Sequence, residues 1–306
     1  MKIPAILTPE PGLATLKPRP WAGSRLARIR GGGNLSTPKI GESWEFSTLK
    51  GSESRVCGKP LSEILQRDLP FLAKLIDTAA PLSVQIHPDD DPQSGICGKE
   101  EAWVILDADE NAQVWVGLAH DCSSEGFKAA LEQVSLDPKQ SQPFLSCLNA
   151  IPVHKGDIVL VPAGVVHAIG AGIFLAEIQQ PSDKTFRFFD YGSKRPLHVE
   201  SALSHLKKGA NAVLLKAHDR APHRLKQTSI AGKHLRLTAF SPGDHAISTD
   251  SNDNLVISVL GTCEAFVAKH KSELVAGDLR LCTQSPWRLR VAQDSLAVVA
   301  WISPPT

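Results

Sequence analysis

Short apolar runs separated by turn residues make up much of the chain before residue 200. Alternation of apolar and polar positions, with many β-branched residues, predicts strands at residues 69–77, 82–87, 102–106, 114–118, 157–161, 165–169, 173–179 and 185–190. Turn sequences such as Asp89-Asp90-Asp91-Pro92 and Pro162-Ala163-Gly164 lie between them. Many short strands at even spacing are typical of a β-sandwich or β-barrel.

A helical pattern interrupts these strands. Phe127, Ala130, Leu131 and Val134 follow one another at helical spacing and predict a helix over residues 124–134. We expect residues 142–150 to be helical as well, and residues 62–65 to form a short helix after Pro60. The pattern therefore predicts a helical insertion at about residues 122–150 within a β domain.

A second set of strands follows a mixed, partly helical bridge at residues 195–211. The predicted strands are residues 234–240, 254–260, 264–269, 278–282, 288–291 and 297–302. We expect two domains: a first domain at residues 1–212 and a smaller β domain at residues 213–306.

A weak internal repeat is compatible with that division. Residues 155–160 (Lys-Gly-Asp-Ile-Val-Leu) resemble residues 276–281 (Ala-Gly-Asp-Leu-Arg-Leu), and the same register places Arg288 where His167 stands. A Gly-Asp pair is also common in hairpin turns, so chance similarity is the alternative.

Composition narrows the possible partners. The 306 residues carry a formal net charge of +1, which argues against nucleic acid as the main partner, and no apolar run approaches the ~20 residues of a membrane-spanning helix. Residues 1–20 lack the apolar core of a signal peptide. The six cysteines are scattered without a C-x-x-C pair, which favours reduced thiols and a cytoplasmic location.

The predicted strand at residues 82–87 carries candidate metal ligands. Side chains alternate across a strand, so Ser83, Gln85 and His87 share one face, whereas Val84 and Ile86 lie on the other. An imidazole and an amide oxygen two residues apart can converge on one metal ion. Taken alone, a strand-end histidine bonded to the backbone is the more common arrangement.

Two later segments could complete such a site. One is Gly98-Lys99-Glu100-Glu101, where either glutamate offers a carboxylate, and the other is the hairpin at residues 162–167, which ends in His167. Two imidazoles, a carboxylate and an amide oxygen suit a borderline divalent ion such as zinc and leave room for water or substrate.

The chain resembles the type I mannose-6-phosphate isomerases in their short bacterial form. The matching segments, in the family's order, are residues 41–47 (Gly-Glu-Ser-Trp-Glu-Phe-Ser), 69–77, 81–90, 98–103, 162–167 and 177–187. They cover most of residues 20–200, whereas the C-terminal part matches only in general character. The chain departs from the family pattern at Ala22 and at Gly192-Ser193, where the family often has an arginine in place of Ser193.

The resemblance implies a mainly β, cupin-type fold, that is, a jelly-roll β-barrel. The strand pattern adds a smaller cupin-like β domain, and the weak repeat, with Arg288 where His167 stands, predicts that this domain holds no metal. The resemblance also implies a zinc-dependent aldose–ketose isomerase with one zinc ion per chain. The family's metal ligands fall on Gln85, His87, Glu101 and His167. Its active-site residues fall on Lys74, Ser83, Lys99, Glu177 and Arg187.

The implied reaction interconverts mannose 6-phosphate and fructose 6-phosphate through a cis-enediol. Glu177, Lys99 and a hydroxide on the metal are alternative bases. Arg187 or Lys74, helped by Ser83, would hold the phosphate; alternatively Arg187 faces the enediol oxygens. The other functions considered are a non-catalytic sugar-binding or regulatory cupin, an isomerase of another sugar phosphate, and a different metal cupin enzyme. We expect a monomer or a weak homo-oligomer.

Overall fold

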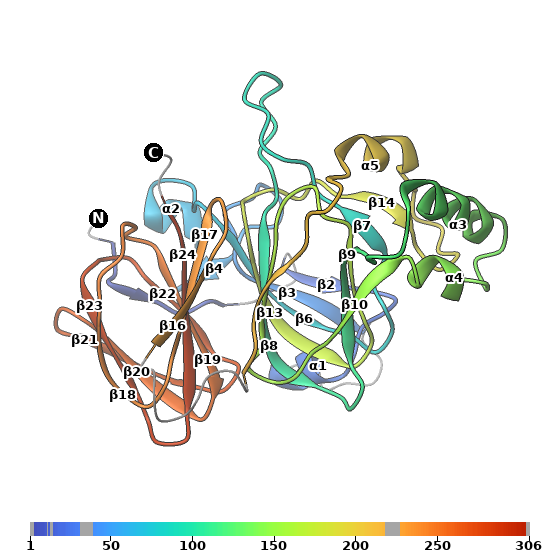
Figure 1. Ribbon diagram of the computed structural model, residues 1–306. Coiled ribbons are helices and arrows are strands. Elements are labelled where there is room, and N and C mark those ends of the chain that lie inside the picture. The colour runs from blue at the N-terminus through green and yellow to red at the C-terminus, as the bar shows by residue number, and fades with distance from the viewer. Residues whose placement is uncertain (1–2, 11, 13–14, 31–38, 218–226, 304–306) are drawn as a thin grey trace.

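The protein is mainly β-structure and consists of two units, each built from two antiparallel sheets (Figure 1). The computed structural model describes residues 3–10, 12, 15–30, 39–217 and 227–303. The mainly β fold predicted from the strand pattern is confirmed. Within these residues, no helix combines the length and the apolar character that crossing a membrane requires.

The first unit pairs a seven-stranded sheet with a five-stranded sheet. The larger sheet has the order β15 (Val213–Leu215), β11 (Ile158–Val161), β8 (Glu101–Ala108), β13 (Ile173–Gln179), β6 (Leu72–Asp77), β3 (Ile40–Phe46) and β2 (Leu16–Pro18). The smaller sheet has the order β10 (Leu148–Pro152), β9 (Gln113–Leu118), β12 (His167–Ile169), β7 (Val84–Ile86) and β14 (Phe186–Phe189).

Side-chain alternation gives the seven-stranded sheet two different faces. Ile76, Trp103 and Leu175 point toward the five-stranded sheet and pack in one apolar cluster with Val116 from β9. Their sequence neighbours point the other way, toward the second unit. The two sheets thus face each other as a sandwich, and hydrogen bonds do not join their edges into a closed barrel among the described strands.

Helices cover the outer side of the five-stranded sheet. They are α3 (Ser124–Leu136), α4 (Gln142–Leu145) and α5 (Val199–His205), which lie together at one end of the molecule in Figure 1. The predicted helix at residues 124–134 is confirmed as α3, which begins where the Ser123 hydroxyl accepts a hydrogen bond from the Gly126 amide. Its apolar stripe, including Phe127 and Leu131, is buried against Phe188 of β14.

The prediction of helix over residues 142–150 is wrong in its second half. Only α4 is helical, and Leu148–Pro152 forms β10, which pairs antiparallel with β9. Pairing with a strand about 35 residues earlier in the chain decides the conformation, and local helical propensity does not report such a partner. Two short helices lie elsewhere, α1 (Arg25–Ile29) and α2 (Leu61–Leu65), the latter beside the small hairpin of β4 (Arg55–Val56) and β5 (Lys59–Pro60).

The second unit pairs a six-stranded sheet with a four-stranded sheet. The larger sheet has the order β1 (Ile6–Leu7), β22 (Leu279–Cys282), β19 (Asn254–Leu260), β24 (Leu296–Ile302), β17 (Leu235–Phe240) and β16 (Gln227–Ala231). The smaller sheet has the order β18 (Gly243–Ile247), β23 (Trp287–Val291), β20 (Thr262–Val267) and β21 (His270–Val275). The N-terminal β1 joins this unit by pairing with β22, whereas β15 pairs with β11 of the first unit, so strand pairing crosses the expected boundary at residue 213 in both directions.

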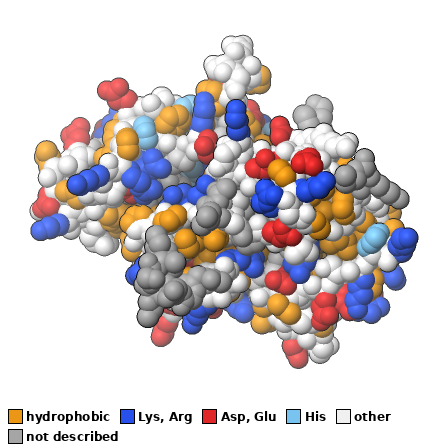
Figure 2. Space-filling model, turned by 180° about the vertical axis from the view of Figure 1, so that it is seen from behind, with side chains coloured by type: hydrophobic (Ala, Val, Ile, Leu, Met, Phe, Trp, Pro, Cys, Tyr) orange, Lys and Arg blue, Asp and Glu red, His pale blue; other side chains and the backbone are white. Residues whose placement is uncertain are grey.

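The two units share one apolar core. Leu75 and Val104, on the outer face of the seven-stranded sheet, belong to the same buried cluster as Leu237, Leu255 and Ile257 of the six-stranded sheet. Large apolar contacts of this kind hold neighbouring units in a fixed relative position. Figure 2 shows lysine and arginine side chains interspersed with aspartate and glutamate on the face behind that of Figure 1, in keeping with the small net charge.

The expected equivalence of Arg288 with His167 is wrong in orientation. Arg288 is exposed on β23 and its guanidinium lies 5.4 Å from the centre of the Phe266 ring, whereas His167 is buried inside the first unit. The inward-pointing neighbours on β23 are Trp287 and Leu289. Within the described residues, the one group of three side chains able to hold a metal ion lies in the first unit.

Candidate metal centre and pocket

Three buried side chains converge between the two sheets of the first unit. His87 follows β7, Glu101 begins β8 and His167 begins β12, and one candidate ligand atom from each lies within 4.8 Å of the others. The Glu101 carboxylate lies 3.2 Å from His87 Nε2 and 3.3 Å from His167 Nε2. We call this group the His–Glu–His cluster.

Hydrogen bonds orient each member of the cluster. His87 Nδ1 lies 2.8 Å from the Lys184 carbonyl oxygen and His167 Nδ1 lies 2.9 Å from the Val165 carbonyl oxygen, so that both rings turn Nε2 toward Glu101. Trp103 Nε1 donates a 3.1 Å hydrogen bond to Glu101. Metal-binding histidines commonly have their second ring nitrogen bonded in this way, because the bond fixes the tautomer and the ring orientation.

Electrostatics favour the protonation states that a metal ion needs. Burial lowers the pKa of His87 to about 3, assisted by the positive charge of Lys99, and burial also lowers the pKa of His167. Burial alone would raise the pKa of Glu101, but Lys99 and the two imidazoles hold it well below its usual value. Two neutral imidazoles and an ionised carboxylate form a donor set that fits a borderline divalent cation.

Gln85 lies beside the cluster, as strand alternation predicted. It pairs with His167 across β7 and β12, and its Nε2 lies 3.4 Å from His167 Nε2. Its amide oxygen instead accepts a 3.1 Å hydrogen bond from Ser83. Gln85 could therefore serve as an oxygen ligand only after its amide group turns over.

Two lysines and a glutamate line the space next to the cluster. Lys99 Nζ lies 2.9 Å from His87 Nε2 and also contacts the Glu101 carboxylate. Glu177 lies 2.8 Å from Lys74 Nζ and 4.0 Å from Lys99 Nζ. Burial lowers the pKa of Lys74, but the charges of Glu177 and Glu42 outweigh it and the net shift is upward.

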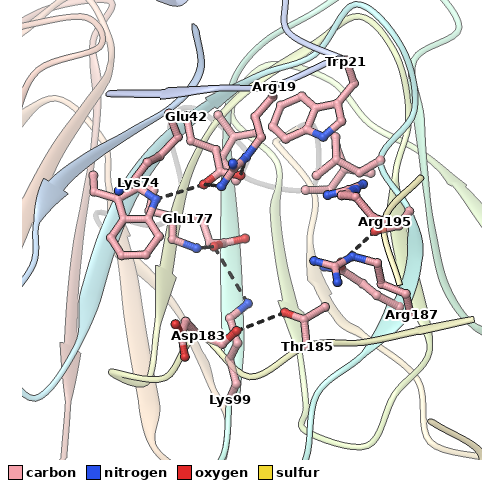
Figure 3. A pocket seen from close by; sticks show the side chains of 17 residues that line it. Arg19, Trp21, Glu42, Lys74, Lys99, Glu177, Asp183, Thr185, Arg187 and Arg195 are labelled. Carbon is pink, nitrogen blue, oxygen red and sulfur yellow. Dashed lines mark hydrogen bonds and ion pairs between the residues drawn. The ribbon is translucent and has the colours of Figure 1, made fainter. Parts of the chain in front are cut away.

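These groups open into a pocket of about 360 Å³. The predicted residues that line it are Lys74, Ser83, Gln85, Lys99, Glu177 and Arg187. His87, Glu101 and His167 lie behind this lining and connect to it through Lys99 and Gln85. In Figure 3, Lys74 and Glu177 project from one side of the pocket, and Arg187 and Arg195 project from the opposite side.

Several pocket residues were not predicted. Arg19 binds Glu42 through two hydrogen bonds of 2.7 and 3.2 Å, and Trp44 Nε1 donates to the same carboxylate at 2.9 Å. Burial would raise the pKa of Glu42, but Lys74 and Arg19 lower it to about 2. Glu42 and Trp44 belong to a segment that carried the family resemblance, so the sequence contained a signal that could have identified them as pocket residues. Nothing in the sequence around Arg19 indicated that it lines the pocket.

A second arginine lines the pocket close to Ser193, where the chain departs from the family pattern. Arg195, two residues later, lines the pocket and binds Asp190 through hydrogen bonds of 2.7 and 2.5 Å. Arg187 lies in the same pocket, and its Nε is buried without a hydrogen-bond partner among the described residues. Burial, followed by repulsion from Arg195, lowers the pKa of Arg187. An anion bound between these two arginines would satisfy the buried donor and relieve their repulsion.

Relatives of known name match more than half of the chain. No protein-family model matches the chain. It is 34% identical over 213 residues to GmuF of Bacillus subtilis, named a probable mannose-6-phosphate isomerase, covering 61% of this chain and 64% of GmuF. It is 35% identical over 217 residues to the mannose-6-phosphate isomerase of Streptococcus mutans, covering 63% of this chain and 66% of that relative. The chain thus matches slightly less than two thirds of each of these two relatives.

A third relative and two solved structures extend the comparison. YvyI of Bacillus subtilis, whose name places it with the same isomerases, is 32% identical over 227 residues, covering 66% of this chain and 67% of YvyI. The mannose 6-phosphate isomerase structure from Bacillus subtilis superposes with a TM-score of 0.71 at 23% identity, covering 98% of this chain and all of that one. A mannose 6-phosphate isomerase bound with zinc and yttrium superposes with a TM-score of 0.69 at 14% identity, covering 98% and 100%.

The structural matches show the cupin fold over nearly the whole chain, and the sequence matches cover between 61% and 66% of it. The chain therefore belongs to the mannose-6-phosphate isomerase family.

Proposed function

We propose that this protein is a zinc-dependent isomerase that interconverts mannose 6-phosphate and fructose 6-phosphate through a cis-enediol. The observation that carries the proposal is the His–Glu–His cluster, which adjoins Lys99 and Glu177 at the base of a pocket rich in arginine. Family membership and the zinc bound in a structure of the same fold support it.

The metal site would consist of His87, Glu101 and His167, with Gln85 as a fourth ligand after rotation of its amide group. One zinc ion per chain would act as a Lewis acid for the negative charge that develops on the sugar's O1 and O2. The buried position of the cluster keeps bulk water away, so fixed charges there act more strongly than at the surface.

Proton transfer between C1 and C2 is assigned to Glu177, with Lys99 as the alternative base. Glu177 is buried, and the ammonium groups of Lys74 and Lys99 approach it from two directions. Lys74 would hold the carboxylate in place, because its ammonium is already bonded to Glu177 and, at 2.6 Å, to Gln179. Lys99 would stabilise charge on the sugar oxygens nearest the cluster.

We assign binding of the substrate's phosphate group to Arg187 and not to Lys74. The Nε of Arg187 is buried and lacks a partner among the described residues, whereas Lys74 already has two acceptors. Arg195 lines the same pocket and would add a second positive charge, and Ser83 would add a hydroxyl donor. Guanidinium groups suit this role because their planar donors match phosphate oxygens.

The setting of the enzyme follows from the same proposal. Its partner would be a small sugar phosphate, and it would act in the cytoplasm, where its six free cysteines can stay reduced. We propose that residues 1–212 form the catalytic domain, with β1 paired onto the second unit and β15 paired onto the first, and that residues 213–306 form a domain without a metal ion of its own. A monomer or a weak homo-oligomer is expected.

A coupled assay of mannose 6-phosphate conversion tests the proposal. Zinc-loaded protein should turn over, chelator should abolish turnover, and added zinc should restore it. Unphosphorylated mannose and other aldose phosphates serve as comparison substrates. If no sugar phosphate is turned over in a chelator-sensitive way, the protein is not this enzyme, and a non-catalytic sugar-binding function remains. If another sugar phosphate is preferred, the assigned substrate is wrong.

A further inference from the structure

Glu100 lies between two active-site residues but points away from them. Along the strand that starts at Glu101, alternate side chains face opposite sides of the sheet, so Lys99 and Glu101 face the cluster and Glu100 faces the second unit. Its carboxylate is nonetheless buried, because residue 100 is only 2% exposed. A buried carboxylate requires hydrogen-bond partners, and the second unit supplies them.

A single turn of the second unit surrounds this carboxylate. The backbone amides of Lys233, His234 and Leu235, where the chain turns from β16 into β17, donate hydrogen bonds of 2.8, 2.9 and 2.7 Å to Glu100. The fit is close: a Cβ atom added at Gly232 would lie 2.5 Å from Glu100 Oε1. Successive amides that converge on one anion form a backbone anion site.

The same turn also binds the segment that follows His87. His234 Nε2 lies 2.7 Å from Asp90 Oδ2, and Lys233 Nζ lies 3.1 Å from carboxylate oxygens of both Asp89 and Asp90. Asp90 in turn accepts a 2.9 Å hydrogen bond from the Gly98 amide. One turn is thus bonded to the chain just after His87 and to the chain between Lys99 and Glu101.

We propose that Glu100 is a positioning residue. Through it and Asp90, the turn at residues 232–235 would hold His87 and Glu101, two of the three members of the His–Glu–His cluster, in position relative to each other. This assigns a role to the second unit, in whose described residues no metal-binding cluster occurs. The inference rests on the metal site of the proposed function but not on the reaction. The apolar core shared by both units keeps the turn fixed relative to the cluster.

The physical basis is preorganisation. Glu101 and His87 stand at strand ends, where the backbone has fewer ladder hydrogen bonds to fix it. The bonds to Glu100 and Asp90 replace that restraint from outside the strands. Groups that orient metal ligands without touching the metal typically change metal affinity 10- to 100-fold when removed.

The test measures Co²⁺ affinity by competition with a chelator, together with the visible absorption spectrum of bound Co²⁺. Two variants break the contact from opposite sides: Glu100→Gln removes the charge, and Gly232→Ala pushes the carboxylate out of the turn from the second unit. Asp253→Asn is the matched control, because Asp253 forms a 2.7 Å ion pair with Arg67 across the same two units, in segments that carry no candidate ligand.

We expect Co²⁺ affinity to fall about 10-fold or more in both contact variants, with an altered spectrum, and to stay at the wild-type value in Asp253→Asn. Should Glu100→Gln fail to fold, Gly232→Ala provides the same comparison. Wild-type affinity and spectrum in a folded contact variant would overturn the positioning role, as would an equal loss in the control. A wild-type protein that binds Co²⁺ but lacks isomerase turnover would count against the proposed function alone.

Discussion

The carboxylate of Glu177 lies 2.8 Å from the ammonium group of Lys74 and 4.0 Å from that of Lys99. Glu177 and Lys74 are direct partners across β13 and β6, so sheet register places them together on the face that lines the pocket. Lys99 lies two residues before the start of β8, and its side chain extends to the same carboxylate. A carboxylate held between two cations, next to a candidate metal centre, is well placed to move a proton within a bound sugar.

Replacing Glu177 with glutamine should lower kcat about 10²- to 10⁴-fold, the usual loss when a general base is removed. The amide keeps the shape of the side chain, so the KM for mannose 6-phosphate should change little. Steady-state kinetics and the uptake of deuterium from solvent at C1 or C2 give the measurement. Glu200→Gln, at an exposed site on α5, should behave as wild type. A kcat within threefold of wild type would exclude Glu177 as the base and leave Lys99 and a hydroxide on the metal as the alternatives.

Removing His167 should empty the metal site. The His167→Ala variant loses one of two imidazoles that face Glu101, and we expect its zinc content to fall from about one ion per chain to nearly none. Elemental analysis after dialysis provides the measurement. His154→Ala is the control, since that side chain is 73% exposed and lies outside the cluster. Full zinc occupancy in His167→Ala would refute the assigned ligand set.

Arg187→Ala should raise the KM for mannose 6-phosphate about 10- to 100-fold, since a hydrogen bond to a charged group contributes roughly 1.5–3 kcal/mol. Inorganic phosphate should inhibit the variant more weakly than wild type, because both ligands would lose the same donors. Arg288→Ala, at an exposed position of the second unit, is the control. If kcat falls while the KM stays constant, Arg187 faces the reacting oxygens and another cation holds the phosphate.

Local pattern predicted how several side chains of the candidate metal centre are arranged. Alternation along residues 82–87 correctly placed Ser83, Gln85 and His87 on one face, and Val84 and Ile86 are buried among the helices on the other. The family resemblance then selected Glu101 over Glu100, and the structure explains the difference, because the two carboxylates point to opposite sides of the sheet. Their roles as ligands remain predictions until a metal is measured.

Contacts between distant segments were beyond the reach of the sequence. Leu148–Pro152 is a strand because β9 pairs with it, and Arg19, which follows β2, enters the pocket because Glu42 of β3 binds it. To predict that Glu100 is buried, one would have to know that it contacts a turn more than 130 residues later in the chain. None of these pairings leaves a period or a motif in a single sequence.

The low pKa of Glu42 predicts a specific dependence of stability on pH. Its pKa falls from 4.5 to about 2 in the folded state, through Lys74 and Arg19 acting against burial, so the ionised carboxylate stabilises the fold above pH 4.5. That contribution, on the order of 3 kcal/mol, should be lost as the pH falls from 4.5 toward 2. We expect Glu42→Gln to have a lower free energy of unfolding than wild type at pH 7, and the difference to shrink toward zero near pH 2. Denaturant unfolding of both metal-free proteins across this range gives the measurement, and a difference independent of pH would contradict the prediction.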